Sequence, residues 1–571
     1  MKKRKWVVAK PAKGSVERIS AKLDILPITA GLLVNRGISS AEDAEAFLSA
    51  SLSDLPSPFL MKGMEEAVAR LCRCVYEKEK VAVYGDFDVD GVTATSLLTG
   101  FLRALGCDVT YYIPDRFKEG YGVNSEALRD LKERQVNLVI SVDCGITAVD
   151  EVAQARTLGM DFIVTDHHNF CGQLPEAVAV LNPRQADCRY PGKEVSGVGV
   201  AFNLALALRR TLREGGFFGT VEEPNMGDFL DLVSLGTVSD RVPVGNVNRI
   251  MLKEGLKRMR SPKRLGLRAL KEVSGIGDGI EVSDLGFRLG PRINAAGRLD
   301  SADKAVELLL ADSEEDAFLL AELLDKRNSE RRGIEERILR DATRMVESVP
   351  EYSNSNSLVL SSREWHRGVV GIVASSIAES YGKPAFLISV DENGVGRGSG
   401  RSFGGINIFS VLSKCGDLLV EFGGHAYAAG VTIPEEKIDL FRGRFSEELE
   451  KSGQKPESKL DIDSEISLDF ISDTLVSEIE SLSPFGEGNP EPLFLSKAVS
   501  VVSQNLLKNQ HVMFRARKNG PVFNCIWFYA SQKRLPEKLD LVFSLRFNVR
   551  NGKREPRLFV RDARESYSEP V

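Results

Sequence analysis

Between residues 80 and 166 the chain alternates short apolar runs with longer segments of helical periodicity. The apolar runs are rich in β-branched and aromatic residues: KVAVYG, DVTYYIP, NLVISVD and DFIVTD, at 80–85, 108–114, 137–143 and 161–166. Helical segments such as TATSLLTGFLRALG and TAVDEVAQARTLG lie between them. Apolar strands that alternate with helices are typical of a parallel sheet covered by helices. The pattern therefore predicts an α/β domain, which we place over residues 76–310.

The pattern beyond this domain becomes helical and then α/β again. Residues 313–347 contain one glycine and no proline. Apolar residues recur there at helical spacing early and charges dominate later, which predicts one long, partly exposed helix. We assign it to a connector over residues 311–350, followed by a second α/β domain over residues 351–450. KSGQKPESK, residues 451–459, reads as a polar linker.

The two ends of the chain predict accessory regions. Residues 1–75 predict a helical region, in which ISSAEDAEAFL forms a helix capped by Ser39 or Ser40. Residues 456–571 consist mostly of short strand-like runs, such as HVMFRARK and VFNCIWFYA. Such runs predict a small β-barrel of the OB type. The predicted fold class is thus α/β, with two α/β domains joined by a long helix and a C-terminal OB-like barrel.

Charge is distributed unevenly along the chain. The whole protein carries a net charge of -6, but residues 501–562 hold thirteen Lys or Arg against four Asp or Glu, a net charge of +9. A basic domain on an acidic chain favours a polyanionic partner; the alternative is a basic face that is only solvated. Aromatic residues interleave with these arginines and either stack on bases or fill the barrel core. They are Phe514, Phe523, Trp527, Phe528 and Phe547.

Composition narrows the cellular setting. No apolar run is long enough to span a bilayer, and no apolar signal core follows the basic start MKKRKWVVAKPAKG. The eight cysteines contain no CxxC pair, which argues against a zinc ribbon or a disulfide framework. These features predict a soluble, cytoplasmic protein without membrane association.

Acidic residues gather at the ends of the predicted strands. Asp86, Asp88 and Asp90 follow the first strand in DFDVDG. This segment matches the first residues of the EF-hand calcium-loop motif. An EF-hand needs a glutamate at its twelfth position and a helix before the loop. The twelfth position here is Leu97, and the preceding segment is a strand. The calcium-loop interpretation is therefore disfavoured.

The remaining strand ends point to a metal site instead. Asp143 ends the third strand, and Asp166, His167 and His168 end the fourth. Ligands of open parallel sheets bind beyond the carboxyl ends of the strands, so these side chains should converge there. Two like charges about 4 Å apart repel by roughly 4 kcal/mol at an effective dielectric constant of 20. Divalent cations remove that cost, and Asp with His suits manganese or similar metals.

The motifs DFDVDG, SVDCG, TDHH and LGTVSD, in this order and spacing, resemble the signature of the DHH phosphoesterase superfamily. Six further segments resemble its bacterial exonucleases: IPDRFKEGYG, LGPRINAAGRLDSA, WHRGVVGIVAS, GRGSGRS, GGHAYAAG and PFGEGNPEPLF. The resemblance covers nearly the whole chain, and the first seventy or so residues least specifically. It implies a sheet-bearing DHH domain, a DHH-associated domain and an OB-like domain.

The resemblance also implies roles for individual residues. Two metal ions, Mn²⁺ or Mg²⁺, would be held by Asp88, Asp90, Asp143, His167 and Asp240. His168 would contact the scissile phosphate and, with Asp143, belong to the catalytic set. Tyr84 stands where relatives often carry a histidine, which would leave five good ligands and a weaker second metal site. Asp86 is a second-layer or spare ligand, and Cys144 a small packing residue.

DNA-binding positions follow from the same resemblance. Repeated glycines in GRGSGRS allow backbone amides to approach phosphate, although a plain glycine-rich turn has the same composition. The family match places a grip on the DNA 5′ end at Ser399 and Arg401, a phosphate contact at Arg116, and strand guidance at Arg292, Asn294 and Arg298. His425 is expected to line the cleft between the two lobes.

The resemblance implies a metal-dependent 5′→3′ exonuclease that hydrolyses single-stranded DNA to 5′-mononucleotides in DNA repair and recombination. The expected partners are single-stranded DNA, an SSB protein and a RecQ-type helicase, with the chain a monomer. Two alternatives are a DHH phosphodiesterase that acts on short oligonucleotides or cyclic dinucleotides, and a non-catalytic DNA-binding scaffold. Chain length and the basic barrel disfavour the first, and the retained acidic residues disfavour the second.

Overall fold

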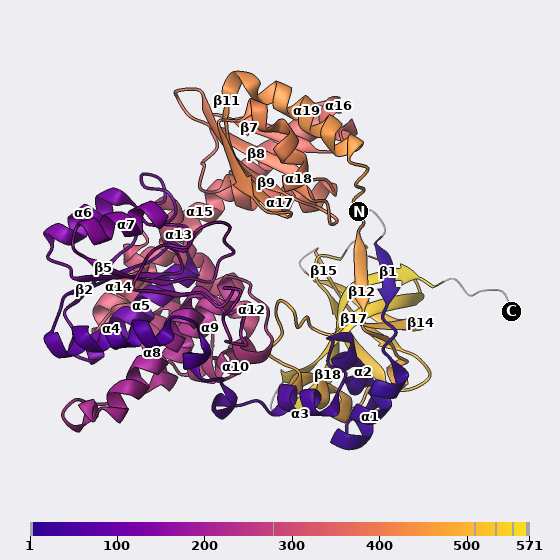
Figure 1. Cartoon of the computed structure of the whole chain (residues 1–571). Coiled ribbons are helices and arrows are strands. Elements are labelled where there is room, and N and C mark those ends of the chain that lie inside the picture. Colours follow the sequence, from indigo (N-terminus) through magenta and orange to yellow (C-terminus); the bar gives the residue numbers. More distant parts are fainter. Residues whose placement is uncertain (1–3, 278, 508–509, 531–533, 551–552, 567–571) are drawn as a thin grey trace.

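The computed structural model describes residues 4–277, 279–507, 510–530, 534–550 and 553–566. Figure 1 shows three bodies: a sheet domain, a smaller α/β domain and a barrel against which the N-terminal helices lie. No helix among these residues is long and apolar enough to cross a membrane. Two lysines of the basic segment, Lys508 and Lys533, lie outside the described residues.

The sheet domain is built on five parallel strands. They are ordered β3 (Val109–Tyr112), β2 (Val81–Tyr84), β4 (Leu138–Val142), β5 (Asp161–Thr165) and β6 (Ala179–Leu181). The first four fall within the four apolar runs, so the predicted parallel sheet is confirmed. Strand β6 was not predicted, because three residues leave no measurable periodicity.

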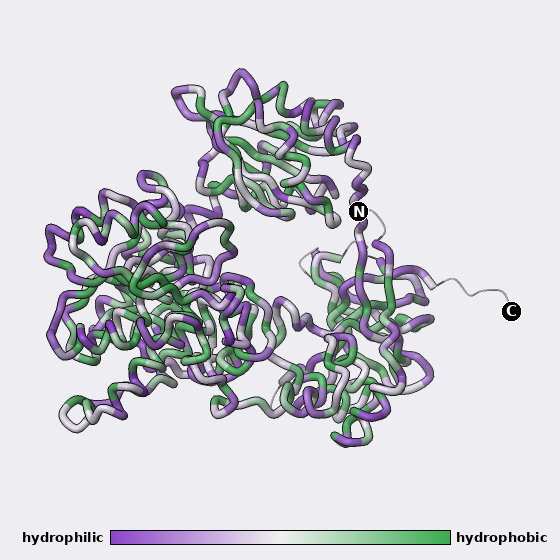
Figure 2. The backbone as a smooth tube through the Cα atoms, in the orientation of Figure 1, coloured by the Kyte–Doolittle hydropathy of each residue, from purple (hydrophilic) through white to green (hydrophobic). Residues whose placement is uncertain are grey.

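Helices cover both faces of this sheet, as fully apolar strands require. On one face α4 (Met64–Glu77), α5 (Val89–Ala104) and α8 (Gly197–Glu214) share a core with Val83 and Ile140. On the other face α6 (Ser125–Glu133) and α7 (Val149–Thr157) pack against alternate strand residues. Figure 2 shows the resulting hydrophobic centre of the domain. Strand order reverses between β2 and β4, so this is the point where a ligand site is expected.

The predicted connector is a 35-residue helix, α15 (Glu314–Ser348). The side chain of Ser313 caps it by accepting a hydrogen bond from Asp316 N. The N-terminal half of α15 buries Ala317, Ala321 and Leu324 in the first core. Its C-terminal half buries Ile338, Ala342 and Val346 in the core of the second domain. The long helix is thereby confirmed, and it fastens one core to the other.

The second domain has a mixed five-stranded sheet. Its order is β10 (Glu421–Gly424), β11 (Ala428–Pro434), β9 (Val395–Arg401), β8 (Ala385–Val390) and β7 (Leu358–Ser362), with only β7 and β8 parallel. Helix α17 (Val370–Tyr381) shares a core with α15 on one face, and α19 (Ile438–Lys451) packs on the other. The glycines of GRGSGRS lie in β9, where Cβ atoms at Gly396, Gly398 and Gly400 would meet neighbouring side chains at under 3 Å.

The C-terminal domain is a closed five-stranded barrel, as predicted. Its order is β14 (Phe494–Leu507), β15 (His511–Arg517), β16 (Val522–Trp527), β18 (Lys553–Glu565) and β17 (Lys538–Arg550), and β17 pairs with β14 to close it. Phe514, Phe523 and Trp527 fill its core. Phe528 is half exposed, and the ring of Phe547 lies 4.2 Å from the Arg554 guanidinium. The aromatic residues therefore divide between packing and surface.

The N-terminal region joins the barrel. Strand β1 (Lys5–Val8) pairs in parallel with β12 (Lys459–Ile462), and α1 (Lys13–Leu23), α2 (Pro27–Asn35) and α3 (Ala41–Ser49) share a hydrophobic core with α20 (Asp473–Ser481) and the barrel. Figure 1 shows these indigo elements against the yellow barrel. The following helix, α4, instead packs in the sheet domain. The chain thus leaves one body for the other between α3 and α4.

Arg249 on α10 (Asn246–Arg260) fastens the sheet domain to the barrel body. The residue is 1% exposed, and its guanidinium donates to Phe47 O, Leu482 O and Ser481 O at 3.0, 2.8 and 3.0 Å. Its guanidinium carbon lies 3.9 Å from the centre of the Phe47 ring. Burial lowers the pKa of Arg249 to about 10, so it stays charged at neutral pH. One buried cation therefore satisfies carbonyls from two separate segments.

We expect Arg249→Met to destabilise this junction. Phe47 O and Ser481 O would lose the hydrogen bonds that Arg249 donates, whereas Leu482 O keeps its hydrogen bond from Asn489 Nδ2. Leaving buried polar groups unpaired costs about 1–3 kcal/mol each. The denaturant midpoint of the full chain should fall, whereas Arg260→Met, at an exposed position on the same helix, should leave it unchanged. Equal midpoints for the two variants would contradict this role for Arg249.

Candidate metal centre and phosphate site

The loop between β2 and α5 presents three aspartates at the sheet edge. Asp88 is the N-cap of α5, and its carboxylate accepts a hydrogen bond from Gly91 N at 3.0 Å. A Cβ atom at Gly91 would lie 2.5 Å from Asp86 O, so this turn requires glycine. Asp86 and Asp90 are 3% and 1% exposed. The predicted alternation therefore brings all three side chains to the same end of the strand.

A second helix N-terminus holds Asp90 in place. Its carboxylate accepts hydrogen bonds from Gly197 N at 2.6 Å and Val198 N at 3.0 Å, in the first turn of α8. A Cβ atom at Gly197 would lie 2.5 Å from Asp143 Oδ1, so glycine also makes room for the next carboxylate. Asp143 follows β4 in the left-handed backbone region, with φ 61°. Tight packing, rather than attraction, brings Asp90 and Asp143 together.

His167 lies at the centre of the group. Its Nε2 is 3.1 Å from Asp143 Oδ1, 3.6 Å from Asp240 Oδ2 and 3.8 Å from Asp90 Oδ2. Ligand atoms lie within 4.8 Å of one another in three overlapping sets: Asp90, His167 and Asp240; Asp143, His167 and His168; and Asp86, Asp88 and Asp143. All five predicted metal ligands therefore meet, and Asp86 joins them.

The donor atoms of this centre fit divalent metal ions. Asp86 Oδ1, Asp143 Oδ1 and both ring nitrogens of His167 are buried without a hydrogen-bond partner, which native proteins rarely tolerate. Burial and neighbouring carboxylates raise the pKa of Asp86 to about 8 and of Asp240 to about 7, and raise those of Asp90 and Asp143 well above their ordinary value. Burying this set of carboxylate and imidazole atoms without partners costs free energy, and bound divalent cations satisfy these atoms.

Asp166 orients the histidine pair and is not itself among the ligand sets. Its Oδ1 accepts hydrogen bonds from His167 N at 2.7 Å and His168 N at 3.0 Å, and lies 2.8 Å from His168 Nδ1. Burial lowers the pKa of His168, but the hydrogen bond with Asp166 and the charge of Asp166 outweigh burial and raise this pKa to about 9. The Tyr121 hydroxyl, 3.3 Å from His168 Nδ1, also lies against this ring. Neither Tyr121 nor this role of Asp166 was predicted from the sequence.

Tyr84 points away from the carboxylates. Its ring packs in the core on the opposite face of the sheet, stacked on Tyr112. Its hydroxyl donates to Gly122 O at 3.1 Å and accepts from Asn124 Nδ2 at 3.2 Å. The extra ligand atom that Tyr84 does not provide is available from Asp86, whose Oδ1 has no partner. The sequence left Asp86 undecided because burial cannot be read from the alternation.

Arginines from both α/β domains gather beside the acidic centre. Arg116, in the loop after β3, stacks over Phe87 at 4.9 Å and lies close enough to Asp86 and Asp88 to interact with their charges. Burial, with the charges of Arg116, Arg331 and Arg401, lowers the pKa of Arg298 to about 10. Among the described residues, Arg116, Arg298 and Arg401 form no ion pair. Cations held together in this way provide a site for a polyanion.

The second domain contributes a helix N-terminus to this arginine group. Arg401, at the end of β9, donates to Ser399 Oγ at 3.1 Å. A Cβ atom at Gly371, in the first turn of α17, would lie 2.9 Å from Ser399 Oγ and 3.2 Å from Arg401 Nη2. Helix N-termini favour phosphate groups through their free backbone amides. Ser399, Arg401 and α17 therefore form a compact candidate phosphate site that faces the sheet domain through Arg298, which donates to Gly368 O at 2.9 Å.

Three other predicted DNA-binding residues lie elsewhere. Arg292 is buried on α13 (Gly290–Leu299) and pairs with Asp325 of α15 at 2.7 Å, so its charge is already matched. Asn294 on the same helix is half-buried. His425 is exposed in the turn that joins β10 to β11. Their contacts with DNA stay predictions.

Family models match three parts of the chain. The DHH family N-terminal domain matches residues 80–237, the DHHA1 domain residues 354–451, and the RecJ OB domain residues 462–562. The "single-stranded-DNA-specific exonuclease RecJ" of Bacillus subtilis is 38% identical over 98% of this chain and 71% of its own length. The Escherichia coli protein of that name is 36% identical over 94% of this chain and 96% of its own length.

Solved structures give the same match. The crystal structure of RecJ in complex with Mn²⁺ from Thermus thermophilus superposes with a TM-score of 0.84 and 30% identity, over 100% of this chain and 81% of that one. A Mg²⁺ complex of RecJ from the same organism superposes with a TM-score of 0.77. The fold and the site thus define a DHH phosphoesterase. With its associated domain, its barrel and these relatives, the chain belongs to the RecJ family.

Metal affinity should rise with pH. In the metal-free protein Asp86 and Asp240 retain protons near neutrality, because their pKa values are raised to about 8 and about 7. Mn²⁺ must displace these protons, so removing them at higher pH strengthens binding. Between about pH 6.5 and about pH 8.5 we expect at least roughly tenfold tighter Mn²⁺ binding in titrations, with measurable proton release. An affinity that does not change over this interval would contradict the raised pKa values.

Proposed function

We propose that this protein is a metal-dependent exonuclease that removes nucleotides from the 5′ end of single-stranded DNA. The observation that supports it most directly is the juxtaposition of two opposite clusters. Buried, unpartnered metal-ligand atoms lie beside arginines that form no ion pair within the described part of the chain. Arg116 is close both to Asp86 and to Arg298. A phosphodiester chain with divalent cations satisfies both clusters. The 5′ polarity is carried over from the family resemblance.

The ligand set of this proposal consists of Asp86, Asp88, Asp90, Asp143, His167 and Asp240. Two bound Mn²⁺ or Mg²⁺ ions would neutralise the phosphate oxygens and activate water for hydrolysis. The chain itself contributes rigid placement, since Asp88 and Asp90 are held by backbone amides of α5 and α8. The burial of His167 and the charge of His168 lower its pKa to about 4, so it is neutral and available as a ligand.

The remaining residues suit the handling of the phosphate and the strand. His168, positively charged through its contact with Asp166, would face the scissile phosphate at the edge of the metal centre. Ser399, Arg401 and α17 would hold the terminal phosphate, with Arg116 and Arg298 between the two positions. The barrel would bind the strand farther along, where Phe528 and Tyr529 are 50% and 77% exposed and lie beside the ring of His511. Bases stack on such aromatic rings while Lys and Arg contact phosphates.

The alternative functions explain less of the structure. A non-catalytic scaffold would not need four buried, unpartnered donor atoms at one point. A phosphodiesterase for short oligonucleotides or cyclic dinucleotides would not need the barrel that relatives named for single-stranded DNA share. A role in repair and recombination, contacts with an SSB protein and a RecQ-type helicase, a monomeric state and a cytoplasmic location stay predictions.

The function is tested with 5′-labelled long single strands, duplexes and dinucleotides, in Mn²⁺ and in EDTA. We expect mononucleotide release from the long single strand with Mn²⁺ only. Asp143→Ala should abolish cleavage while strand binding, followed by fluorescence anisotropy, stays nearly intact. Asp187→Ala, an exposed position in the same domain, is the control.

Each other outcome of this assay points to one alternative. Cleavage confined to dinucleotides would support the short-substrate phosphodiesterase, and binding without cleavage the scaffold. Full activity of Asp143→Ala would refute the metal assignment.

Arg401→Ala should weaken recognition of the terminal phosphate. Parental protein is expected to bind a 5′-phosphorylated strand more tightly than the matching 5′-hydroxyl strand, because Arg401 has no acidic partner among the described residues. Loss of one charge-assisted hydrogen bond, about 1.5–3 kcal/mol, should reduce that preference roughly tenfold or more. Arg397→Ala is the matched control on the same strand, since Arg397 already pairs with Asp391 at 3.2 Å. An unchanged preference in Arg401→Ala would place the phosphate elsewhere.

A further inference from the structure

Asp240 differs from Asp88 and Asp90 in how its carboxylate is held. Asp88 and Asp90 accept hydrogen bonds from helix N-termini. Asp240 is the C-cap residue of α9 (Leu230–Ser239), and among the described residues no group donates a hydrogen bond to its carboxylate. The next residue, Arg241, has φ 60°, a strained conformation for a residue with a side chain. Something beyond the helix must therefore fix the direction of this turn.

The turn, residues 241–244, lies against a loop of the barrel domain, residues 484–491. Val244 N donates a hydrogen bond to Glu487 O at 2.7 Å, and the Arg241 guanidinium lies 3.6 Å from the Glu487 carboxylate. On its inner side, Pro243 O accepts from Asn248 Nδ2 at 2.9 Å. The turn after Asp240 is thus held between its own domain and the barrel loop.

Two glycines allow this close approach. A Cβ atom at Gly486 would lie 2.7 Å from Val244 Cγ2, and one at Gly488 would lie 3.0 Å from Pro243 Cβ. Gly488 also has φ 70°, which favours glycine. These glycines belong to PFGEGNPEPLF, a segment that neither the metal centre nor the phosphate site uses. The close contact with the turn after Asp240 explains why this segment carries glycine at positions 486 and 488.

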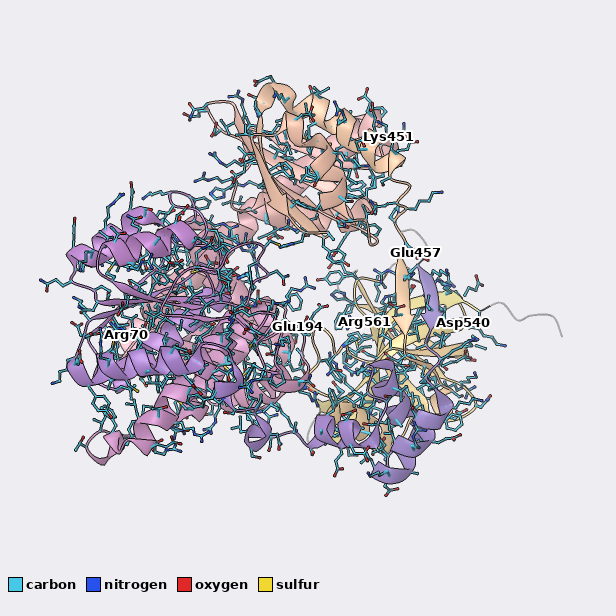
Figure 3. The ribbon with its side chains drawn as sticks, viewed as in Figure 1. Arg70, Glu194, Lys451, Glu457, Asp540 and Arg561 are labelled. Atoms are coloured by element: carbon cyan, nitrogen blue, oxygen red, sulfur yellow. The ribbon has the colours of Figure 1, made fainter. Side chains whose placement is uncertain are left out.

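The barrel loop is itself rigidly supported. Asn489 is 1% exposed, and its Nδ2 donates to Leu482 O at 2.9 Å and Pro484 O at 2.8 Å. Its Oδ1 accepts from Arg36 Nε at 2.7 Å, which ties the loop to α2 of the N-terminal region. Glu491 pairs with Arg546 and with Arg561, the latter at 3.2 Å. In Figure 3, Arg561 of the barrel and Glu194 of the sheet domain lie on facing sides of the boundary between these two bodies.

We propose that residues 484–491 form a positioning element for Asp240, so that docking of the barrel sets the geometry of the metal centre. The inference rests on the proposed function, in which Asp240 is a metal ligand. The barrel then has two tasks, since the body that binds the strand also completes the site that cleaves it. Outer residues that orient ligands typically change metal affinity by 10–100-fold when they are altered.

The test adds one methyl group at the contact. Gly486→Ala in the full chain should bind Mn²⁺ about tenfold more weakly in a titration followed by electron paramagnetic resonance of the free ion. Cleavage should require correspondingly more Mn²⁺ but reach the parental rate at saturation. The double variant Gly486→Ala with Val244→Ala should recover Mn²⁺ affinity, because it removes the Cγ2 atom that the new methyl group would meet.

Matched variants separate positioning from other causes. Gly245→Ala adds the same methyl group one residue after Val244, where no atom lies within 4 Å, and should bind Mn²⁺ as the parent does. Asp240→Ala calibrates the loss of the ligand itself. Should Gly486→Ala not fold, as judged by circular dichroism, Arg241→Ala, which removes the ion pair with Glu487, serves in its place.

The failures of the two proposals are distinguishable. Parental Mn²⁺ affinity in folded Gly486→Ala, together with weakened binding in Asp240→Ala, would overturn the positioning role alone. Parental affinity in Asp240→Ala would overturn the ligand assignment on which it rests. Weakened binding in Gly486→Ala without rescue by the Val244 change would also count against the contact.

Discussion

Mutual repulsion among buried carboxylates is the constraint on which this structure depends. Asp86, Asp90 and Asp143 are almost fully buried, and Asp240 is close to them. Charges of one sign about 4 Å apart repel by roughly 4 kcal/mol even at an effective dielectric constant of 20. The fold holds them together through features that carry no negative charge: two helix N-termini, glycines at points of contact, and a left-handed backbone at Asp143. A metal-binding centre is thus prepared at the cost of stability in the metal-free protein.

In the arginine cluster the fold likewise holds charges of one sign close together, but these charges are positive. Arg116, Arg298 and Arg401 come from a loop, a helix and a strand of two domains, and among the described residues they have no acidic partners in ion pairs although carboxylates are close. Arg292, by contrast, is paired with Asp325 and acts in packing. The distinction between paired and unpaired arginines separates residues that hold the fold from those available to phosphate. A nucleic-acid strand with its cations complements both clusters.

The placement of the three bodies relies on directional contacts. The helix α15 contributes to two cores, and Arg249 donates to carbonyls of α3 and of the segment after α20. The loop at residues 484–491 meets the chain immediately after Asp240. The contacts of Arg249 and of this loop are hydrogen bonds and packed glycines, so they specify orientation more strictly than exposed ion pairs, which contribute little. The sheet domain is therefore in contact, at the turn after Asp240, with a body that is remote from it in sequence.

Sequence patterns determined much of this architecture and part of its site. The four main strands, the long helix, the barrel and the position of acidic residues at strand ends all follow from periodicity and composition, which are local properties. Five candidate metal ligands could be named because their motifs resemble those of the DHH family; four of them end or follow predicted strands, whereas Asp240 ends a helix. Tertiary structure decided the rest: that Asp86 lies among the candidate ligands while Tyr84 faces the opposite core, that Arg292 is paired with Asp325, and that the N-terminal helices pack against the barrel. The contact from Arg36 to Asn489 spans 453 residues. No local pattern reports such an approach, because burial and the choice of partner depend on how distant segments pack.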